Sequence, residues 1–173
     1  ICRGVDRARW APEENIHLTV RFIGEVREDV MEDIVAELSM VGGDPFDVAV
    51  AGAGHFESGH RVRALWLGIE RNPALQSLRE RVDAAVARAG LPPEGRKFKP
   101  HITLARVNDG SPDEVRGWLR ANTLFRSVPF AVSQFSLYSS FRGRNGSIYR
   151  SEADFPLGPV EPWPEEEGPD WMD

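Results

Sequence analysis

Hydrophobic and polar residues recur along the chain with two periods, which divide it into predicted strands and helices. Residues 15–24 alternate with a period of two, the pattern of a half-buried strand. Apolar residues at helical spacing cover 28–41 and 73–89, and a glycine follows each stretch. Further strands are predicted over 46–50, 61–69, 101–107, 129–139 and 147–155, a third helix over 111–121, and loops over 55–60, 95–100 and 143–146. The pattern therefore predicts a chain that mixes strands and helices.

The predicted elements occur twice. Residues 17–20 read HLTV, and residues 101–104 read HITL, 84 positions later. Phe46 lies 29 positions after His17 and Phe130 lies 29 positions after His101, with a predicted helix in between each time. A matched motif inside a matched unit indicates an internal duplication with pseudo-twofold symmetry.

The two copies differ in what precedes them. A predicted strand and helix, residues 61–90, lead into the second motif, whereas only sixteen residues precede His17. We therefore expect the first motif to lack a preceding strand and helix in this chain.

Each copy carries a histidine and a threonine two positions apart, so both side chains project from one face of a strand. Either motif alone is most often structural, because threonine suits the pleat of a strand. As a pair, His17, Thr19, His101 and Thr103 would present two imidazoles and two hydroxyls to one cleft. One imidazole can act as general base and the other as general acid, and the hydroxyls can donate to phosphoryl oxygens. This set suits in-line displacement at phosphorus, with the acid and base unassigned.

Arginines near the motifs are candidates for a phosphate clamp, since guanidinium suits bidentate phosphate contact. Arg21 shares the predicted face of His17 and Thr19. Arg106 falls on the face opposite His101 by period two, which makes Arg21 the better candidate. A solvent-exposed strand end is the alternative interpretation of both arginines.

Other residues are candidates for contact with RNA, or simply for an exposed charged surface. The candidate RNA-binding residues are Lys97, Lys99, Arg144 and Tyr138. Aromatic residues that could stack a base are Phe22, Phe56, Trp66 and Tyr138, of which Phe22 and Trp66 are expected in the core.

The charge of the chain is uneven. Its net charge is −6, yet residues 161–173 hold six acids and no lysine or arginine, so the remainder is neutral. An acidic total therefore does not argue against a nucleic-acid partner. We expect one two-lobed domain over 1–156 and an acidic, proline-rich extended tail over 157–173.

Composition also bears on location and cofactors. The one cysteine, Cys2, cannot form an internal disulfide, which favours a cytoplasmic protein. No apolar run has the length that a bilayer requires, so we expect no membrane partner. His55 and His60 lack the further ligands of a zinc site, and no metal or cofactor is expected.

The motifs resemble those of a known family. HLTVRFIGEV (17–26) and KPHITLARV (99–107) are similar to the paired motifs of the two-histidine phosphoesterase superfamily, and within it to its RNA 2′,3′-cyclic phosphodiesterase or 2′-5′ RNA ligase family. LWLG (65–68) and FSLYSS (135–140) extend the resemblance, which covers roughly 10–155.

The resemblance implies two α+β lobes around a central cleft, each an antiparallel sheet with flanking helices. It also implies a metal-free reaction that opens a 2′,3′-cyclic phosphate to a 2′-phosphate, with 2′-5′ ligation as the reverse. The expected substrate and partner is RNA with a 2′,3′-cyclic phosphate end or a small cyclic nucleotide. It implies that His17 protonates the leaving 3′ oxygen, that His101 activates water, and that Thr19 and Thr103 hold the phosphate. Family members usually begin with an apolar strand and helix, in line with the gap before His17. Two alternatives stay open: an RNA-end binding module without turnover, and another substrate, such as 2′-5′ oligoadenylate or cyclic ADP-ribose phosphate.

Overall fold

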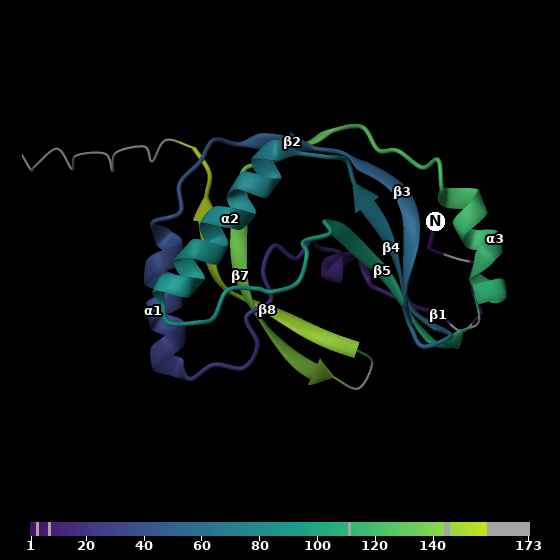
Figure 1. The fold of residues 1–173 in the computed structure, drawn as a ribbon, viewed down its shortest axis with the longest axis horizontal. Helices are drawn as coiled ribbons and strands as arrows, with labels where there is room; N and C mark the ends of the chain where they lie inside the picture. Colours follow the sequence, from purple (N-terminus) through teal and green to yellow (C-terminus); the bar gives the residue numbers. More distant parts are fainter. Residues whose placement is uncertain (3, 7, 111, 144–145, 159–173) are drawn as a thin grey trace, which may run out of the picture.

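The computed structural model describes residues 1–158 apart from 3, 7, 111, 144 and 145, and its architecture is α+β (Figure 1). The strands are β1 (Ala8–Trp10), β2 (Phe46–Val48), β3 (Val50–Ser58), β4 (Arg61–Ile69), β5 (His101–Gly110), β6 (Phe130–Val132), β7 (Gln134–Gly143) and β8 (Gly146–Pro156). The helices are α1 (Glu28–Ser39), α2 (Pro73–Arg88) and α3 (Pro112–Asn122), with a 3-10 turn η1 (Glu13–Asn15).

One lobe, called here the sheet lobe, is a four-stranded antiparallel sheet in the order β1-β5-β4-β3 with α3 packed against one face. Val62 and Leu65 of β4 are fully buried against Val115 and Trp118 of α3. Trp10 of β1 completes this layer, with its ring 6.0 Å from that of Trp118. The opposite face of the sheet points toward the other lobe (Figure 1).

The second lobe, called the helix lobe, packs α1 and α2 against the β7–β8 ribbon and the short β2–β6 pair (Figure 1). Its core contains Ile34 of α1, Leu78 and Val86 of α2, and Phe155 of β8. Phe155 stacks on Phe135 with 4.9 Å between ring centroids. The two separate cores confirm the predicted two-lobed fold.

The start and end of α2 are specified locally. The side chain of Asn72 accepts a hydrogen bond of 2.9 Å from the N–H of Leu75, and Pro73 occupies the first helical position. Gly90 follows the helix with φ of 92°, a left-handed conformation that favours glycine. The residues on the inner side of α2 recur every three or four positions, as the sequence predicts.

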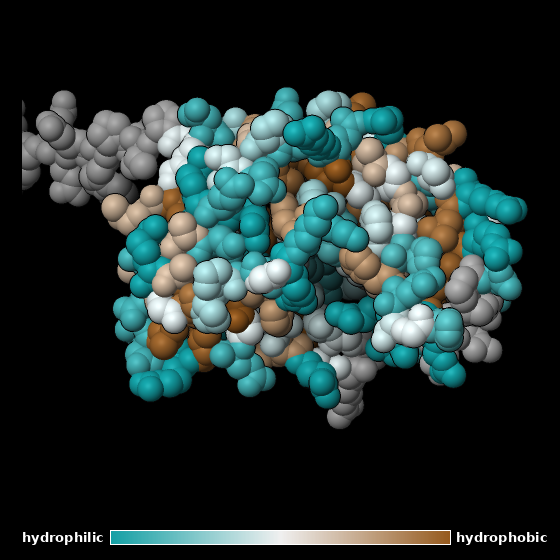
Figure 2. All heavy atoms as spheres, viewed as in Figure 1, coloured by the Kyte–Doolittle hydropathy of each residue, from teal (hydrophilic) through white to brown (hydrophobic). Residues whose placement is uncertain are grey.

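The lobes do not correspond to the two halves of the chain. β3 and β4 from the first half share the sheet lobe with β5 and α3, whereas α1 from the first half packs beside β8. Val20, the last residue of the first motif, and Ile23 pack against the helix-lobe core, while the second motif begins β5 of the sheet lobe. The duplicated halves are therefore interlaced, and the two motifs meet between the lobes, where the surface is hollowed (Figure 2).

One prediction about the first motif is wrong, and a second is wrong in part. Residues 15–24 do not form a strand; their one pairing is an isolated antiparallel bridge from Leu18 to Ile102. A strand needs a neighbour along its length, and this bridge is the only pairing in that segment among the described residues. A strand does precede His17, because β1 forms the edge of the sheet lobe by pairing with β5, but only the 3-10 turn η1 and no α-helix comes before His17 among the described residues. With only three residues, β1 is too short for its hydrophobic and polar positions to show the period of a strand, so the sequence did not predict it.

Two predicted boundaries also shift. Residues 55–58, expected in a loop, continue β3 to a tight turn at Gly59, where φ is 63°. At the other end, Leu157 is buried in the helix lobe and Gly158 donates to the carbonyl of Gly43. The predicted tail thus starts inside the packed fold, and its remainder, residues 159–173, lies outside the described residues.

Candidate active site

The two histidine motifs are joined at one point. The Leu18–Ile102 bridge is antiparallel. Adjacent residues in an antiparallel pair point to the opposite face, so the same register places His17 opposite Thr103 and Thr19 opposite His101. The bridge thus brings the two predicted histidine–threonine pairs together on one face of the paired segments. The pseudo-twofold axis that relates the two motifs passes through the bridge.

Both histidines are oriented by the same kind of hydrogen bond. Nδ1 of His17 lies 2.7 Å from the carbonyl oxygen of Asn15, and Nδ1 of His101 lies 2.6 Å from that of Lys99. A carbonyl only accepts, so Nδ1 must carry the proton in each ring. Nε2 has no hydrogen-bond partner among the described residues. It can accept a proton in the neutral ring and donate one in the charged ring, which is what acid–base catalysis requires.

An aromatic wall supports His101. The ring of Phe56 meets the imidazole edge-on at 4.9 Å between centroids, and Trp66 lies at 6.1 Å. Trp66 covers Gly54, where a Cβ would lie 2.2 Å from the indole. The indole Nε1 is buried without a partner in the described part of the chain. A glycine at position 54 therefore makes room for the ring that supports the histidine.

His17 is supported from the helix lobe. Its ring meets that of Tyr149 of β8 edge-on at 4.9 Å between centroids. The amide Nδ2 of Asn15 donates to the carbonyl of Ser147 at 3.2 Å, on the same strand. Asn15 therefore links the carbonyl that orients His17 to β8.

Arg106 shares a face with His101, contrary to the expectation from period two. Leu65 pairs with Ala105 and Trp66 with Thr103, so Leu104 is an extra residue in β5. Leu104 and Ala105 are both buried in the sheet-lobe core, and this bulge turns Arg106 back to the open face. Two consecutive core residues in an otherwise alternating strand were the sequence signal for it.

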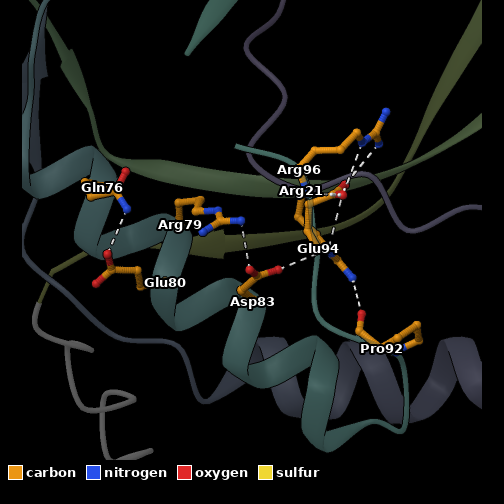
Figure 3. A network of polar contacts seen from close by, with 8 residues as sticks. All are labelled: Arg21, Gln76, Arg79, Glu80, Asp83, Pro92, Glu94 and Arg96. Carbon is orange, nitrogen blue, oxygen red and sulfur yellow. Dashed lines mark hydrogen bonds and ion pairs between the residues drawn. The ribbon is translucent and has the colours of Figure 1, made fainter. Parts of the chain in front are cut away.

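The side chain of Arg21 makes contacts within the chain instead of facing solvent (Figure 3). Its guanidinium donates to the carbonyl of Pro92 at 2.6 Å and lies 3.3 Å from Asp83 and 3.8 Å from Glu94. Only 8% of its side chain is exposed, and Nε is buried without a partner among the described residues. Phosphate contact by Arg21 stays a prediction that would require a rearrangement of this network.

Glu94 extends the network to the loop before His101. Arg96 donates to its carboxylate through Nε at 3.1 Å and Nη2 at 3.0 Å (Figure 3). These side-chain bonds, the backbone N–H of Arg96 and the nearby charges of Arg96 and Arg21 lower the pKa of Glu94 from 4.5 to about 2. The same pairing raises the pKa of Arg96.

The remaining candidates are more scattered. Lys97 and Lys99 are exposed in the loop before β5, and Tyr138 is exposed on β7. Arg144 lies outside the described residues. Contact of these four residues with RNA stays a prediction. The expectation of Phe22 in the core is wrong, because 67% of the residue is exposed. No strand in the described part of the chain pairs with residues 21–24 to cover that side chain.

Two further features concern metals and membranes. The described ranges contain no group of three histidine, cysteine or carboxylate side chains placed to hold a metal ion. His55 instead contacts Glu57 at 2.7 Å. No helix within the described residues is both long and apolar enough to cross a bilayer.

Known proteins and a family model resemble the chain over most of its length. The model of the 2′-5′ RNA ligase superfamily matches residues 3–144. The chain is 37% identical over 147 residues to the RNA 2′,3′-cyclic phosphodiesterase of Thermotoga maritima, covering 83% of this chain and 76% of that protein. It is 33% identical over 142 residues to the protein of the same name from Aeropyrum pernix, covering 80% of each.

Solved structures show the same fold. The crystal structure of LigT from E. coli complexed with 3′-AMP superposes with a TM-score of 0.69 at 27% identity, covering 88% of this chain and 82% of that one. TT0787 of Thermus thermophilus, at 24% identity, has a TM-score of 0.74 and covers 90% of this chain and 85% of its own. The fold and family predicted from the sequence are both confirmed. The chain belongs to the 2′-5′ RNA ligase superfamily.

Proposed function

We propose that this chain hydrolyses 2′,3′-cyclic phosphates at RNA ends to 2′-phosphates without a metal ion. The observation that carries the proposal is the pair of imidazoles, each with Nδ1 on a carbonyl and a free Nε2, on either side of the Leu18–Ile102 bridge. The name of the curated relatives, RNA 2′,3′-cyclic phosphodiesterase, supports the substrate class.

In the proposed reaction, Nε2 of His101 removes a proton from water as its oxygen attacks the phosphorus. The bond from phosphorus to the 3′ oxygen breaks, and Nε2–H of His17 protonates that oxygen. This assignment of base and acid follows the family resemblance. Each transfer contributes about 10²- to 10⁴-fold to the rate. With the 5′ hydroxyl of a second RNA in place of water, the same displacement would form a 2′-5′ linkage.

Hydroxyl and guanidinium donors hold the phosphate in this proposal. Thr19 and Thr103 lie opposite the two histidines and can donate to non-bridging oxygens. Arg106, placed on the His101 face by the bulge, adds a charged donor of the kind that stabilises phosphoryl transfer. Phe56 and Trp66 beside His101 offer surfaces on which a base can stack.

The test is hydrolysis of a 2′,3′-cyclic nucleotide in EDTA, with the product identified. His17→Ala and His101→Ala should each lower kcat by about 10²- to 10⁴-fold, and the double variant by less than the product of the two. His60→Ala, in the exposed turn after β3, is the matched control and should keep full activity. Full activity in either variant, or activity only after metal is added, would contradict the proposal. Binding without product would instead leave an RNA-end binding module.

We also infer a cytoplasmic location, supported by the lone Cys2, which is exposed. A cytosolic RNA end is the setting in which this reaction would find its substrate. Fractionation of cells with an antibody to the chain would test the location, and recovery outside the cytosol would contradict it.

A further inference from the structure

Two arginines oppose each other on the open face of the sheet lobe. Arg9 of β1 is the direct antiparallel partner of Arg106 of β5, and both are exposed. Ala8 and Trp10, on either side of Arg9, pack against the sheet-lobe core. Because neighbours in a strand alternate, Arg9 points to the same face as Arg106. This pair is called here the arginine pair.

The arginine pair has no protein counterion in the described part of the chain. Other arginines do have carboxylate partners: Arg21 and Arg79 pair with Asp83, and Arg96 pairs with Glu94. Like charges directly opposite in a sheet are destabilising, so the pair lowers stability unless an anion joins it. The arrangement points to a binding site for an anion rather than to a structural role.

The position of the pair indicates which anion. β5 runs from His101 through Thr103 to Arg106, all on the open face, and β1 lies beyond as the edge strand. Arg106 is three residues from Thr103, which is at most about 10 Å along a strand. Thr103 therefore lies at the proposed reacting phosphate, and Arg106 and Arg9 lie where a second phosphate of the same strand would be. A single RNA strand supplies a second phosphate next to the terminal cyclic phosphate, and a cyclic mononucleotide does not.

We propose that Arg9, beside Arg106, binds the penultimate phosphate of an RNA strand and makes the chain prefer oligonucleotides to cyclic mononucleotides. This rests on the proposed function. Arg106 contacts both phosphates in this arrangement, whereas Arg9 contacts only the second. Arg9 is thus a specificity-determining residue, and its effect appears only with substrates of two or more nucleotides.

The experiment compares kcat/KM for a 2′,3′-cyclic mononucleotide with that for a dinucleotide ending in the same cyclic phosphate. Arg9→Ala should lower the ratio of dinucleotide to mononucleotide about three- to fivefold, the effect of one exposed ion pair. The loss should lie in KM and should fade at high salt. Arg120→Ala, on the exposed side of α3 across the sheet, removes the same charge and should leave the ratio unchanged.

A second variant separates a binding role from a structural one. Arg9→Glu converts the arginine pair into an opposite-charge pair, so it should raise the thermal unfolding midpoint while it lowers the substrate ratio further. Affinity for a fluorescent oligonucleotide ending in a phosphate is measured in parallel. The logarithm of this affinity should fall with the logarithm of the salt concentration. The slope should be smaller in magnitude by about 0.7 for Arg9→Ala than for the wild-type chain.

The outcomes distinguish the two proposals. Turnover of both substrates with a ratio that Arg9→Ala leaves unchanged would overturn the second-phosphate site and keep the hydrolysis. No turnover of either substrate, with oligonucleotide affinity that falls in Arg9→Ala, would overturn the hydrolysis and keep the site. If Arg9→Ala changes neither the oligonucleotide affinity nor the ratio of dinucleotide to mononucleotide kcat/KM, the second-phosphate site is overturned.

Discussion

At the scale of single residues, each histidine is oriented by the carbonyl two positions before it, and the first of these carbonyls belongs to a residue with a second contact. Asn15 accepts from His17 through its carbonyl and donates to Ser147 through its amide. We expect Asn15→Ala to lower kcat roughly 10- to 100-fold with a smaller change in KM, because a displaced imidazole fails chiefly in the transition state. Steady-state kinetics on the cyclic nucleotide measure this.

The control for Asn15 is Asn122→Ala. Asn122 donates to the carbonyl of Trp118 at 2.8 Å and is also partly buried, but it lies on α3, away from the histidines. Both variants should lose about 1 kcal/mol of unfolding free energy, as for one hydrogen bond. If kcat falls equally in the two, Asn15 has only a structural role.

At the scale of elements, the sheet lobe is shaped around His101 by a bulge and by a glycine. A Cβ at position 54 would lie 2.2 Å from the indole of Trp66, so Gly54→Ala must displace that ring and, through it, His101. We expect a loss of about 1–3 kcal/mol in unfolding free energy together with reduced kcat. Denaturant unfolding and kinetics on the same sample measure the two effects.

Gly117→Ala is the matched glycine substitution for this element. Nothing lies within 4 Å of a Cβ at position 117, which is an exposed position within α3. Alanine there should stabilise the fold by about 0.5–1 kcal/mol, because glycine is unfavourable in a helix. Wild-type stability in Gly54→Ala would show that Trp66 is free to move aside, against the role given to it here.

At the scale of the whole molecule, one polar network links the segment after the first motif to the loop before the second. The lowered pKa of Glu94, about 2, means that its carboxylate is more stable in the folded state than in the unfolded chain. Its contribution to stability is therefore full above pH 4.5 and is lost as the pH falls toward 2. Glu94→Gln should lower the unfolding midpoint at neutral pH and flatten its dependence on pH between these limits.

Thermal unfolding at several pH values from 6 to about 2 tests this. Glu25→Gln is the control, because Glu25 is exposed and has no ion pair in the described ranges. Profiles for Glu94→Gln and wild type that stay parallel between pH 4.5 and 2 would contradict the assignment.

Several features were accessible from periodicity and local chemistry. α1 and α2 appear where apolar residues recur at helical spacing, and the asparagine cap and proline of α2 mark its start. The strand at His101 was also found. No strand forms over 15–24, because the Leu18–Ile102 bridge is its only pairing among the described residues, and Ile16 and Phe22 of the predicted buried face are exposed.

The chain by itself determined the family and the four residues proposed to act on phosphate, since His17, Thr19, His101 and Thr103 recur in a duplicated unit. It also determined both long helices through local spacing. Only the tertiary structure decided how the halves interlace, which side chains orient each imidazole, and that Arg106 rather than Arg21 reaches the open face. The physical reason is that a bulge, a cross-strand pair and an ion-pair network depend on residues distant in sequence, which no local period records.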